Sequence, residues 1–469
     1  MIKSRQFTLD QFAPIAVYNK LKGAFSDEIS FLFESAGNSD GNYSFIIIGA
    51  RERLTYKDKT TYYHDENGTV NTFKSSPFDF LKEYYKNVDT DLYKKSVKEL
   101  GIGYVDGFIG FMGYDMVKVF EPVLDSFMDD LEDEMKTPDM DLILPKMIVA
   151  YSHKDHKITM ISQIESFSSQ FESLETLLKS SYSYIPLKKL EGDDRGDYAF
   201  SKPKFFEMVA QSKEMIKSGD VFQILMTNRF TRNVKVDPFS FYRILRTKNP
   251  SPYMFLMEYE DFSIVGSSPE VMVRLSEGEL LLRPIAGTRK RGDTKQRDKE
   301  LEDELLADPK ELAEHLMLID LGRNDVGRVA KAGTVKVKDM MHIERYSHVM
   351  HIVTDVEAEL AEDKDMFDLF AATFTAGTMT GAPKIRAMEL IAEYEGLKRG
   401  FYSGAIGYFG FDGNMDSAIT IRTSMVMPDR VILQAGAGIV ADSVDEMEYQ
   451  EVHNKLGALM SSLDDLKDS

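Results

Sequence analysis

The sequence predicts an α+β protein in which helices surround mainly antiparallel β-sheets. Its apolar β-like runs come in groups joined by turns of hairpin length, which favours antiparallel sheets over a doubly wound parallel sheet. At 469 residues the chain is too long for one compact core, so we expect two domains or one large body with two sheets. Its 43% hydrophobic and 29% charged residues are the balance of a globular protein.

The first 181 residues predict an N-terminal region rich in strands. Here β-like runs alternate with turns at 43–49, 142–151 and 157–162, and helical periodicity follows near 165–180. Residues 182–200 carry Pro, Gly and a charge cluster, which is typical of a linker. Residues 201–469 then form a second region.

The second region alternates helices with groups of strands. A helix is expected over about 203–218, with Gly219 as its stop. Asp237 and Asp308, each followed by Pro, are expected N-caps of two further helices, and the second helix runs to about Leu321. The other expected elements are strands at 221–230, 253–286, 342–360, 403–411, 415–425 and 430–440, a helix after Pro383 and a last helix over about 443–461.

Charge and composition exclude several classes of function. The formal net charge of −20 repels a phosphate backbone, so broad nucleic-acid binding is not expected. The chain contains no Cys, which excludes disulfides, thiolate metal sites, Fe–S clusters and a Cys nucleophile. We find no stretch typical of a signal peptide or a transmembrane helix, so a cytoplasmic protein is expected.

Two pairs of glutamates are candidate metal ligands. Glu311 and Glu314 lie three residues apart on one expected helix, and Glu448 and Glu451 do the same on the last helix. If these two helix faces meet, the carboxylates would suit a hard cation such as Mg²⁺. The alternative is a capping role for Glu311 and solvated helix faces for the others.

Three polar side chains lie in apolar surroundings. His351 shares a strand face with Val349 and Val353, so it is either a hydrogen-bonded core residue or a catalytic one. Arg422 and Lys455 are isolated cations, and an Arg in a β-run usually needs an anionic partner. Glycine-rich turns that let a backbone approach a ligand follow strands at 286–288, 376–378 and 435–438.

Five segments together resemble the chorismate-utilising enzymes. They are PIAGT at 284–288, EHLMLIDLGRND at 314–325, GTMTGAPK at 377–384, YSGA at 402–405 and GAGIV at 436–440. The resemblance covers about 200–460, in order and without large gaps. It implies a large sandwich of two mainly antiparallel sheets with helices outside and a Mg²⁺-dependent site between the sheets.

The resemblance also implies roles for individual residues. Glu314 and Glu451 correspond to the Mg²⁺ ligands, with Glu311 and Glu448 as their outer partners. The other residues implied to bind chorismate are Gly287, Thr288 and Thr378 at its ring, Tyr402 and Arg422 at its enolpyruvyl carboxylate, and Gly436, Ala437, Gly438 and Lys455 at its ring carboxylate. Glu270 matches the general acid that protonates the departing C4 hydroxyl, which requires a raised pKa. His351 matches a histidine that assists this departure.

Two positions separate branches of the family. Family members that add water to chorismate share a Lys that acts as the base, and this chain has Gln223 at the matching position. Aminodeoxychorismate synthases typically have a nucleophilic Lys where this chain has Ala286. The pair Gln223 and Ala286 resembles the branch that converts chorismate and ammonia to anthranilate and pyruvate, the first step toward tryptophan. Its ammonia would come from a separate glutamine amidotransferase subunit. The alternatives are an aminodeoxychorismate synthase without that Lys, and a non-catalytic subunit that senses tryptophan.

The N-terminal region carries a resemblance to the feedback site of that branch. The segments are FLFES at 31–35 and NPSPYM at 249–254, and Phe33 departs from the usual Leu. They imply an L-tryptophan site that includes Glu34, Ser35, Pro252, Tyr253 and Met254. An edge strand and a proline turn are the alternative interpretation.

Overall fold

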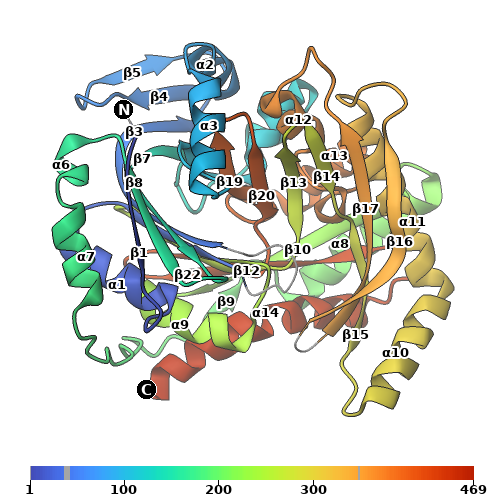
Figure 1. Ribbon diagram of the computed structural model, residues 1–469. Coiled ribbons are helices and arrows are strands. Elements are labelled where there is room, and N and C mark those ends of the chain that lie inside the picture. Colours follow the sequence, from blue (N-terminus) through green and yellow to red (C-terminus); the bar gives the residue numbers. More distant parts are fainter. Residues whose placement is uncertain (1, 36–42, 347–348, 469) are drawn as a thin grey trace.

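Two long strands join two antiparallel sheets into one body (Figure 1). The structure is a computed structural model that describes residues 2–35, 43–346 and 349–468. Strand β3 (Tyr43–Lys57) pairs with β2 near its beginning and with β4 near its end. Strand β7 (Met140–Ser152) pairs with β6 through its first residues and with β8 through its last. Each of these strands therefore contributes to both sheets.

The first sheet is built from both ends of the chain. Its order is β1 (Lys3–Thr8), β8 (Lys157–Ser162), β7, β3, β2 (Ser30–Glu34), β11 (Tyr253–Glu258), β12 (Ser263–Ser268), β21 (Thr423–Val426), β22 (Val431–Ile439) and β10 (Gln223–Arg232). The short strands β9 (Asp197–Tyr198) and β18 (Gly381–Ala382) add to β10.

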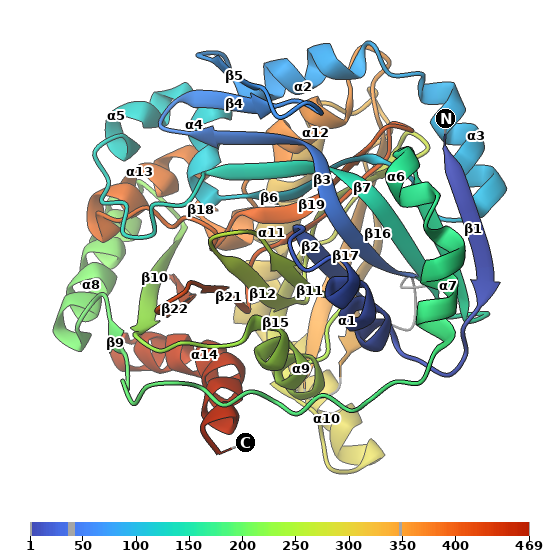
Figure 2. The ribbon, with the colours of Figure 1, turned by 90° about the vertical axis from the view of Figure 1, so that its left-hand side faces the viewer.

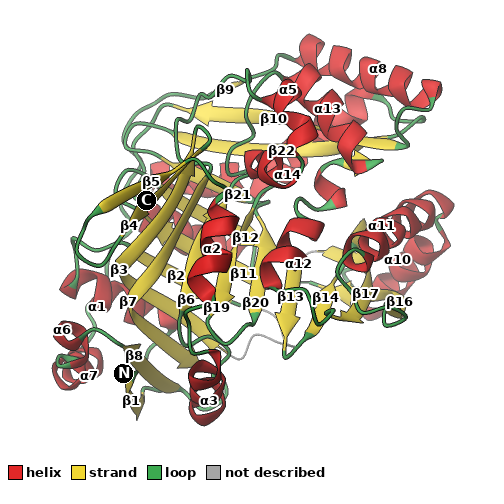
Figure 3. Cartoon of the chain, turned by 90° about the horizontal axis from the view of Figure 1, so that it is seen from above, coloured by secondary structure: helices red, strands yellow, loops and turns green. Residues whose placement is uncertain are grey.

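The second sheet continues from β3 and β7 in the other direction, and Figure 3 shows its strands side by side. Its order is β5 (Val70–Phe73), β4 (Thr60–His64), β3, β7, β6 (Gly107–Met112), β19 (Ala405–Gly410), β20 (Met415–Ile419), β13 (Val271–Ser276), β14 (Glu279–Leu282) and β17 (Val349–Glu359). β17 also pairs with β15 (Ile285–Lys290) and β16 (Lys336–Arg345). The predicted α+β body with two mainly antiparallel sheets is confirmed.

Helices cover the outer faces of the sheets. Those on the first sheet are α1 (Pro14–Ala24), α7 (Phe171–Lys179), α8 (Lys202–Ser218), α9 (Pro238–Lys248), α13 (Lys384–Glu395) and α14 (Asp445–Asp468), and Figure 2 shows α1, α9 and α14 along it. α10 (Lys295–Ala307) and α11 (Pro309–Gly327) lie against β15. The other helices are α2 (Pro77–Tyr85), α3 (Thr90–Leu100), α4 (Val117–Phe120), α5 (Asp125–Met128), α6 (Glu165–Ser168) and α12 (Met366–Thr373). No helix in the described ranges is long and apolar enough to cross a bilayer.

Strand alternation divides the interior into two main cores. Neighbouring side chains of a strand point to opposite faces of the sheet. Phe31 and Ile47 accordingly pack in the core shared with side chains of the second sheet. Leu32 and Ile46 point the other way and pack beneath the outer helices. Both regions of the chain contribute to both sheets, and residues 181–196 between them form no helix and only one isolated bridge, at Glu191.

Local sequence signals place most helix ends correctly. Gly219 ends α8 with a left-handed φ of 85°, and the Asp237 carboxylate accepts a hydrogen bond of 2.9 Å from the Ser240 amide at the beginning of α9. The expected helices that end at Leu321 and near residue 461 continue to Gly327 and Asp468, because apolar side chains such as Val326 and Leu466 stay buried there.

Two expected strands are divided in the structure. The stretch 415–425 forms β20 and β21, because Arg422 takes a left-handed φ of 51° that ends the extended conformation. The stretch 342–360 contains the end of β16 and the whole of β17, which pair with each other as a hairpin. The first of these breaks places Arg422 in the site described below.

Candidate active site

Carboxylates from two distant helices meet beside β10. Glu314 of α11 accepts a hydrogen bond of 3.3 Å from Gln223 Nε2. Burial raises the pKa of Glu314, the Gln223 bond lowers it, and the neighbouring carboxylates Glu311 and Glu451 raise it. Glu451 of α14 forms an ion pair of 2.7 Å with Lys455, whose ammonium also donates to the Gly436 carbonyl at 2.9 Å.

The two outer glutamates have partners of their own. Glu311 pairs with the Arg289 guanidinium at 3.1 Å, and the Asp308 carboxylate caps α11. Burial raises the pKa of Glu448, which a hydrogen bond with Ser443 lowers in part. Within the described ranges, no three acidic or histidine side chains are close enough to hold a metal together. Glu314 and Glu451 are nevertheless a chemical fit for Mg²⁺, which takes one or two carboxylates and fills its other positions with ligand oxygens and water.

Glu270 has the environment of a general acid. It lies between β12 and β13 and is 7% exposed. Burial raises its pKa to about 7, and three groups lower it in part: the Thr378 hydroxyl, which donates at 3.0 Å, Lys455 and Arg422. A carboxyl group with this pKa keeps its proton in a large fraction of molecules near neutrality, as proton donation requires.

His351 lies on the side of β17 that faces away from a core cluster. Its neighbours Met350 and Ile352 pack there with Leu305. His351 Nδ1 is 2.9 Å from the Gly287 carbonyl, an acceptor only, so Nδ1 carries the proton and Nε2 is the acceptor of the neutral ring. Burial lowers the pKa of His351, the Gly287 bond raises it and Arg422 lowers it. His351 thus lies on the face of β17 away from this apolar cluster, with its ring bonded to Gly287 and Arg422 near it.

Arg422 and the residue after Tyr402 have unusual backbone conformations. Arg422 has a φ of 51°, and Ser403, which follows Tyr402, has a φ of 65°. Non-glycine residues in this conformation are uncommon and cluster at functional sites. Burial lowers the pKa of Arg422, near which lie Tyr402, Glu451 and Glu270. In the part of the chain that the structure describes, its guanidinium makes no hydrogen bond or ion pair, so an anionic ligand would complete it.

Glycines let the surrounding backbone approach the site closely. A Cβ at Gly438 would lie 2.6 Å from Gln223 Nε2, and one at Gly287, which has a φ of 62°, would lie 3.1 Å from Glu311 Oε2. The Ala437 side chain is fully buried beneath the outer helices, so only its backbone can contact a ligand. Thr288 Oγ1 is 3.2 Å from His351 Nδ1. The structure thus places the residues implied to bind chorismate around one point.

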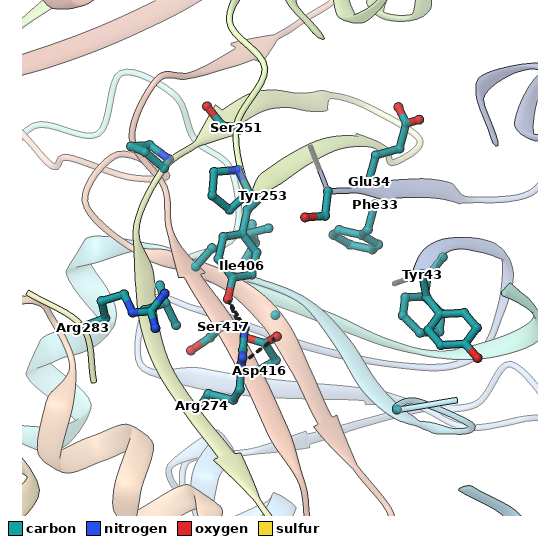
Figure 4. A pocket seen from close by; sticks show the side chains of 18 of the residues that line it. Phe33, Glu34, Tyr43, Ser251, Tyr253, Arg274, Arg283, Ile406, Asp416 and Ser417 are labelled. Atoms are coloured by element: carbon teal, nitrogen blue, oxygen red, sulfur yellow. Dashed lines mark hydrogen bonds and ion pairs between the residues drawn. The ribbon is translucent and has the colours of Figure 1, made fainter. Parts of the chain in front are cut away.

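A separate cavity of about 740 Å³ opens between the two sheets (Figure 4). Glu34, Ser35, Pro252 and Tyr253 line it, whereas the Met254 side chain packs in the core on the opposite face of β11. The Glu34 carboxylate is already bound by Arg246, at 2.8 and 2.9 Å, and by Tyr242 at 2.6 Å.

The cavity also contains a charged pair that was not predicted from the sequence. Asp416 accepts a hydrogen bond of 2.9 Å from the Tyr253 hydroxyl and lies 3.4 Å from Arg274 Nε. Arg289, which holds Glu311, was also not identified. The signal in both cases is a charged residue inside a β-like run, and such residues usually need partners when they are buried.

Comparison with known proteins assigns the class. The family model described as chorismate binding enzyme matches residues 6–461, so the chain belongs to this family. Within the family, anthranilate synthase component 1 of Aquifex aeolicus is 42% identical over 99% of this chain and 94% of its own length. The corresponding protein of Acetivibrio thermocellus is 38% identical over 97% and 94% of the two chains.

Solved structures agree with this grouping. The crystal structure of anthranilate synthase component I from Streptococcus pneumoniae has a TM-score of 0.77 and 33% identity, over 96% of this chain and 98% of that one. The menaquinone-specific isochorismate synthase MenF of Escherichia coli has a TM-score of 0.72 and 18% identity, over 99% and 95% of the chains. At that identity the second comparison indicates the shared fold alone.

Proposed function

We propose that the chain is component I of an anthranilate synthase, which converts chorismate and ammonia to anthranilate, pyruvate and water. The observation that carries the proposal is the Arg422 guanidinium, which lies beside Glu270 and Glu451 and makes no side-chain bond within the described ranges. Chorismate is a dicarboxylate, and one of its carboxylates supplies the missing partner. The proposal also rests on relatives that are about 40% identical over nearly the whole chain.

Each group then has a task in the reaction. Tyr402 and Arg422 hold the enolpyruvyl carboxylate, while Lys455 and the Gly436 and Gly438 amides receive the ring carboxylate. Gly287, Thr288 and Thr378 line the ring. Glu314 and Glu451 would hold Mg²⁺, which when bound would supply positive charge to offset the ring carboxylate. Glu311 and Glu448 support the two ligands from outside.

Glu270 and His351 act on protons. Ammonia forms a bond to C2, and the C4–O bond breaks as Glu270 gives its proton to the leaving hydroxyl, which departs as water. The new ammonium group then loses one proton, which restores the overall proton balance. His351 assists this departure. In the second stage the C2 proton and the enolpyruvyl group leave, and the group takes up a proton to become pyruvate. Bound chorismate is a dianion, which raises the pKa of Glu270 further and keeps this acid protonated in mildly alkaline solution.

Gln223 matches ammonia as the nucleophile. An amide is not a base, and free ammonia already carries the lone pair that attacks C2. Gln223 is 7% exposed, its Nε2 donates to Glu314, and its Oε1 has no hydrogen-bond partner in the described ranges. That oxygen is placed to accept a hydrogen bond from an N–H group.

The proposal includes a partner and an inhibitor. The chain has no Cys nucleophile for glutamine, so a separate glutamine amidotransferase subunit would supply ammonia in the cytoplasm. The cavity between the sheets, whose lining includes neither Glu314 nor Glu451, is the proposed site for L-tryptophan as a feedback inhibitor.

The test is product identification. The purified chain is incubated with chorismate, Mg²⁺ and an ammonium salt, and anthranilate is measured by fluorescence and pyruvate by a coupled assay. Equal amounts of anthranilate and pyruvate, absent when Mg²⁺ is chelated, are expected. An amino product that keeps its enolpyruvyl ether would instead identify an aminodeoxychorismate synthase. No product from chorismate would identify a non-catalytic subunit.

A further inference from the structure

A fully buried ion pair lies behind the proposed active site. The side chains of Glu395, the last residue of α13, and Arg399 are 2% and 1% exposed. Arg399 binds both oxygens of the Glu395 carboxylate, through Nε at 2.9 Å and Nη2 at 2.7 Å. A buried ion pair contributes little to stability compared with well-packed apolar side chains, so its presence calls for another role.

The other contacts of the pair reach three separate pieces of the site. Arg399 Nη1 donates to the Met379 carbonyl at 2.8 Å, and Nη2 donates to the Leu225 carbonyl at 2.8 Å. The Thr227 amide donates to Glu395 Oε1 at 2.9 Å. Met379 follows Thr378, and Leu225 and Thr227 continue the strand that begins at Gln223.

The third piece is the Tyr402 loop. Arg399 accepts a hydrogen bond of 3.3 Å from the Tyr402 amide through its carbonyl oxygen. Its guanidinium lies 4.8 Å from the centre of the Tyr114 ring, which covers the remaining face of the Arg. The guanidinium is therefore held by the Glu395 carboxylate and one aromatic ring, and it donates to the backbone of two segments that carry site residues.

We infer that Glu395 and Arg399 are positioning residues whose side chains hold the Thr378 turn and the Gln223 end of β10 in register for the reaction, at the point where the Tyr402 loop begins. The inference rests on the proposed function. It requires Arg rather than Lys, because a planar guanidinium donates several hydrogen bonds in fixed directions and an ammonium does not. Lys at position 399 would keep the charge opposite Glu395 and lose one or both carbonyl contacts.

The Thr378 turn gives this inference a signature that a purely structural role lacks. The Thr378 hydroxyl donates to Glu270 and so favours its ionised form. If the turn loosens, this bond weakens and the pKa of Glu270 rises. The other charged or titratable groups near Glu270 are Lys455, Arg422 and Tyr346, and the Arg399 side chain bonds none of them in the described ranges. The alkaline limb of the pH profile, where Glu270 loses its proton, should therefore move to higher pH.

The experiment compares Arg399→Lys with Arg232→Lys. Arg232 is a matched control at the far end of β10 from Gln223, since it is buried and its partners are Asp464 and the Asp194 carbonyl. The kcat for anthranilate is measured across pH at a constant concentration of free ammonia. Arg399→Lys should lower kcat on the order of 10²-fold, the cost of a small misplacement of reacting groups, and shift the alkaline limb upward. Arg232→Lys should match wild type in both.

A second variant keeps the test decisive if Arg399→Lys does not fold. Glu395→Gln keeps the size of the side chain and weakens its hold on Arg399, so it should move kcat and the alkaline limb in the same directions by less. Thr378→Val alone should shift the limb, and adding Arg399→Lys or Glu395→Gln to it should shift the limb no further. A folded positioning variant with the kcat and pH profile of Arg232→Lys would overturn the inference. If wild type makes no anthranilate, the proposed function fails instead.

Discussion

The proposed active site and the cavity between the sheets differ in how their charges are satisfied. Around Glu270, Arg422 makes no side-chain bond within the described ranges and Glu314 lies near two other carboxylates. In the cavity, Glu34 is bound by Arg246 and Asp416 by Tyr253. Unsatisfied charge is costly unless a charged ligand or ion completes it. The first region is therefore suited to an anionic substrate with Mg²⁺, and the second to a ligand without net charge, such as the amino acid proposed above.

The largest expected effect comes from the metal ligands. Glu314→Gln or Glu451→Gln should abolish anthranilate formation, because each change removes an Mg²⁺ ligand and a compensating charge. Glu446→Gln is the control, since Glu446 lies on the same helix as Glu451 and pairs with Lys202. Full activity of either active-site variant at ordinary Mg²⁺ concentrations would contradict the assignment of the metal site to this region.

A second prediction concerns the source of the nitrogen, which is either ammonia or glutamine. The isolated chain should make anthranilate from ammonium salts and none from glutamine, because it has no Cys. At a fixed total ammonium concentration the rate should rise in mildly alkaline solution, since more ammonia is then unprotonated. Adding the amidotransferase subunit should confer glutamine use and flatten this pH dependence. Glutamine-dependent product from the chain alone would contradict the account.

His351→Ala should lower the rate by about 10²–10⁴, the usual span for a lost acid–base group. Thermal unfolding should change little, because the core packing of β17 involves Met350 and Ile352 on its other face. The measurement is kcat together with a melting curve. A variant that no longer folds would restore the interpretation of His351 as a core residue.

The smallest effect on turnover is expected in the cavity. Ser35→Phe should fill space beside Tyr253 and relieve inhibition by tryptophan, and chorismate turnover should stay close to that of wild type. Feedback requires two states that bind tryptophan with different affinity, so the inhibition curve reports the cavity and the uninhibited rate reports the active site. Ser126→Phe, on an exposed helix, is the control. Equal inhibition of wild type and Ser35→Phe would exclude Ser35 from the site.

Much of the fold follows from local signals in the sequence. Asp237 and Gly219 mark helix ends through capping and left-handed φ, both of which depend on neighbouring residues. The bending of β3 and β7 into two sheets depends on pairing partners that are up to about a hundred residues away, so periodicity does not predict it. The break at Arg422 is equally invisible, because a left-handed φ on Arg is imposed by tertiary contacts.

The residues of the proposed site were also predicted only in part, because some of them are defined by contacts in three dimensions. The resemblance named the residues that are proposed to contact substrate, since their types are set by chemistry. It did not name Arg399 or Arg289, whose roles depend on what they touch in three dimensions. Strand alternation alone already indicates that Tyr253 and Met254 point to opposite faces of β11, and only Tyr253 lines the cavity.

The most direct test of this comparison is a crystal structure of the protein with Mg²⁺ and chorismate, flash-cooled before turnover completes. The account predicts a metal between Glu314 and Glu451, a ring carboxylate at Lys455 and a second carboxylate on Arg422. Density for chorismate, or for the anthranilate and pyruvate formed from it, should fill this site and leave the cavity beside Ser35 and Tyr253 without it. Chorismate in that cavity, with Arg422 making no contact to a ligand, would contradict the assignment of the two regions.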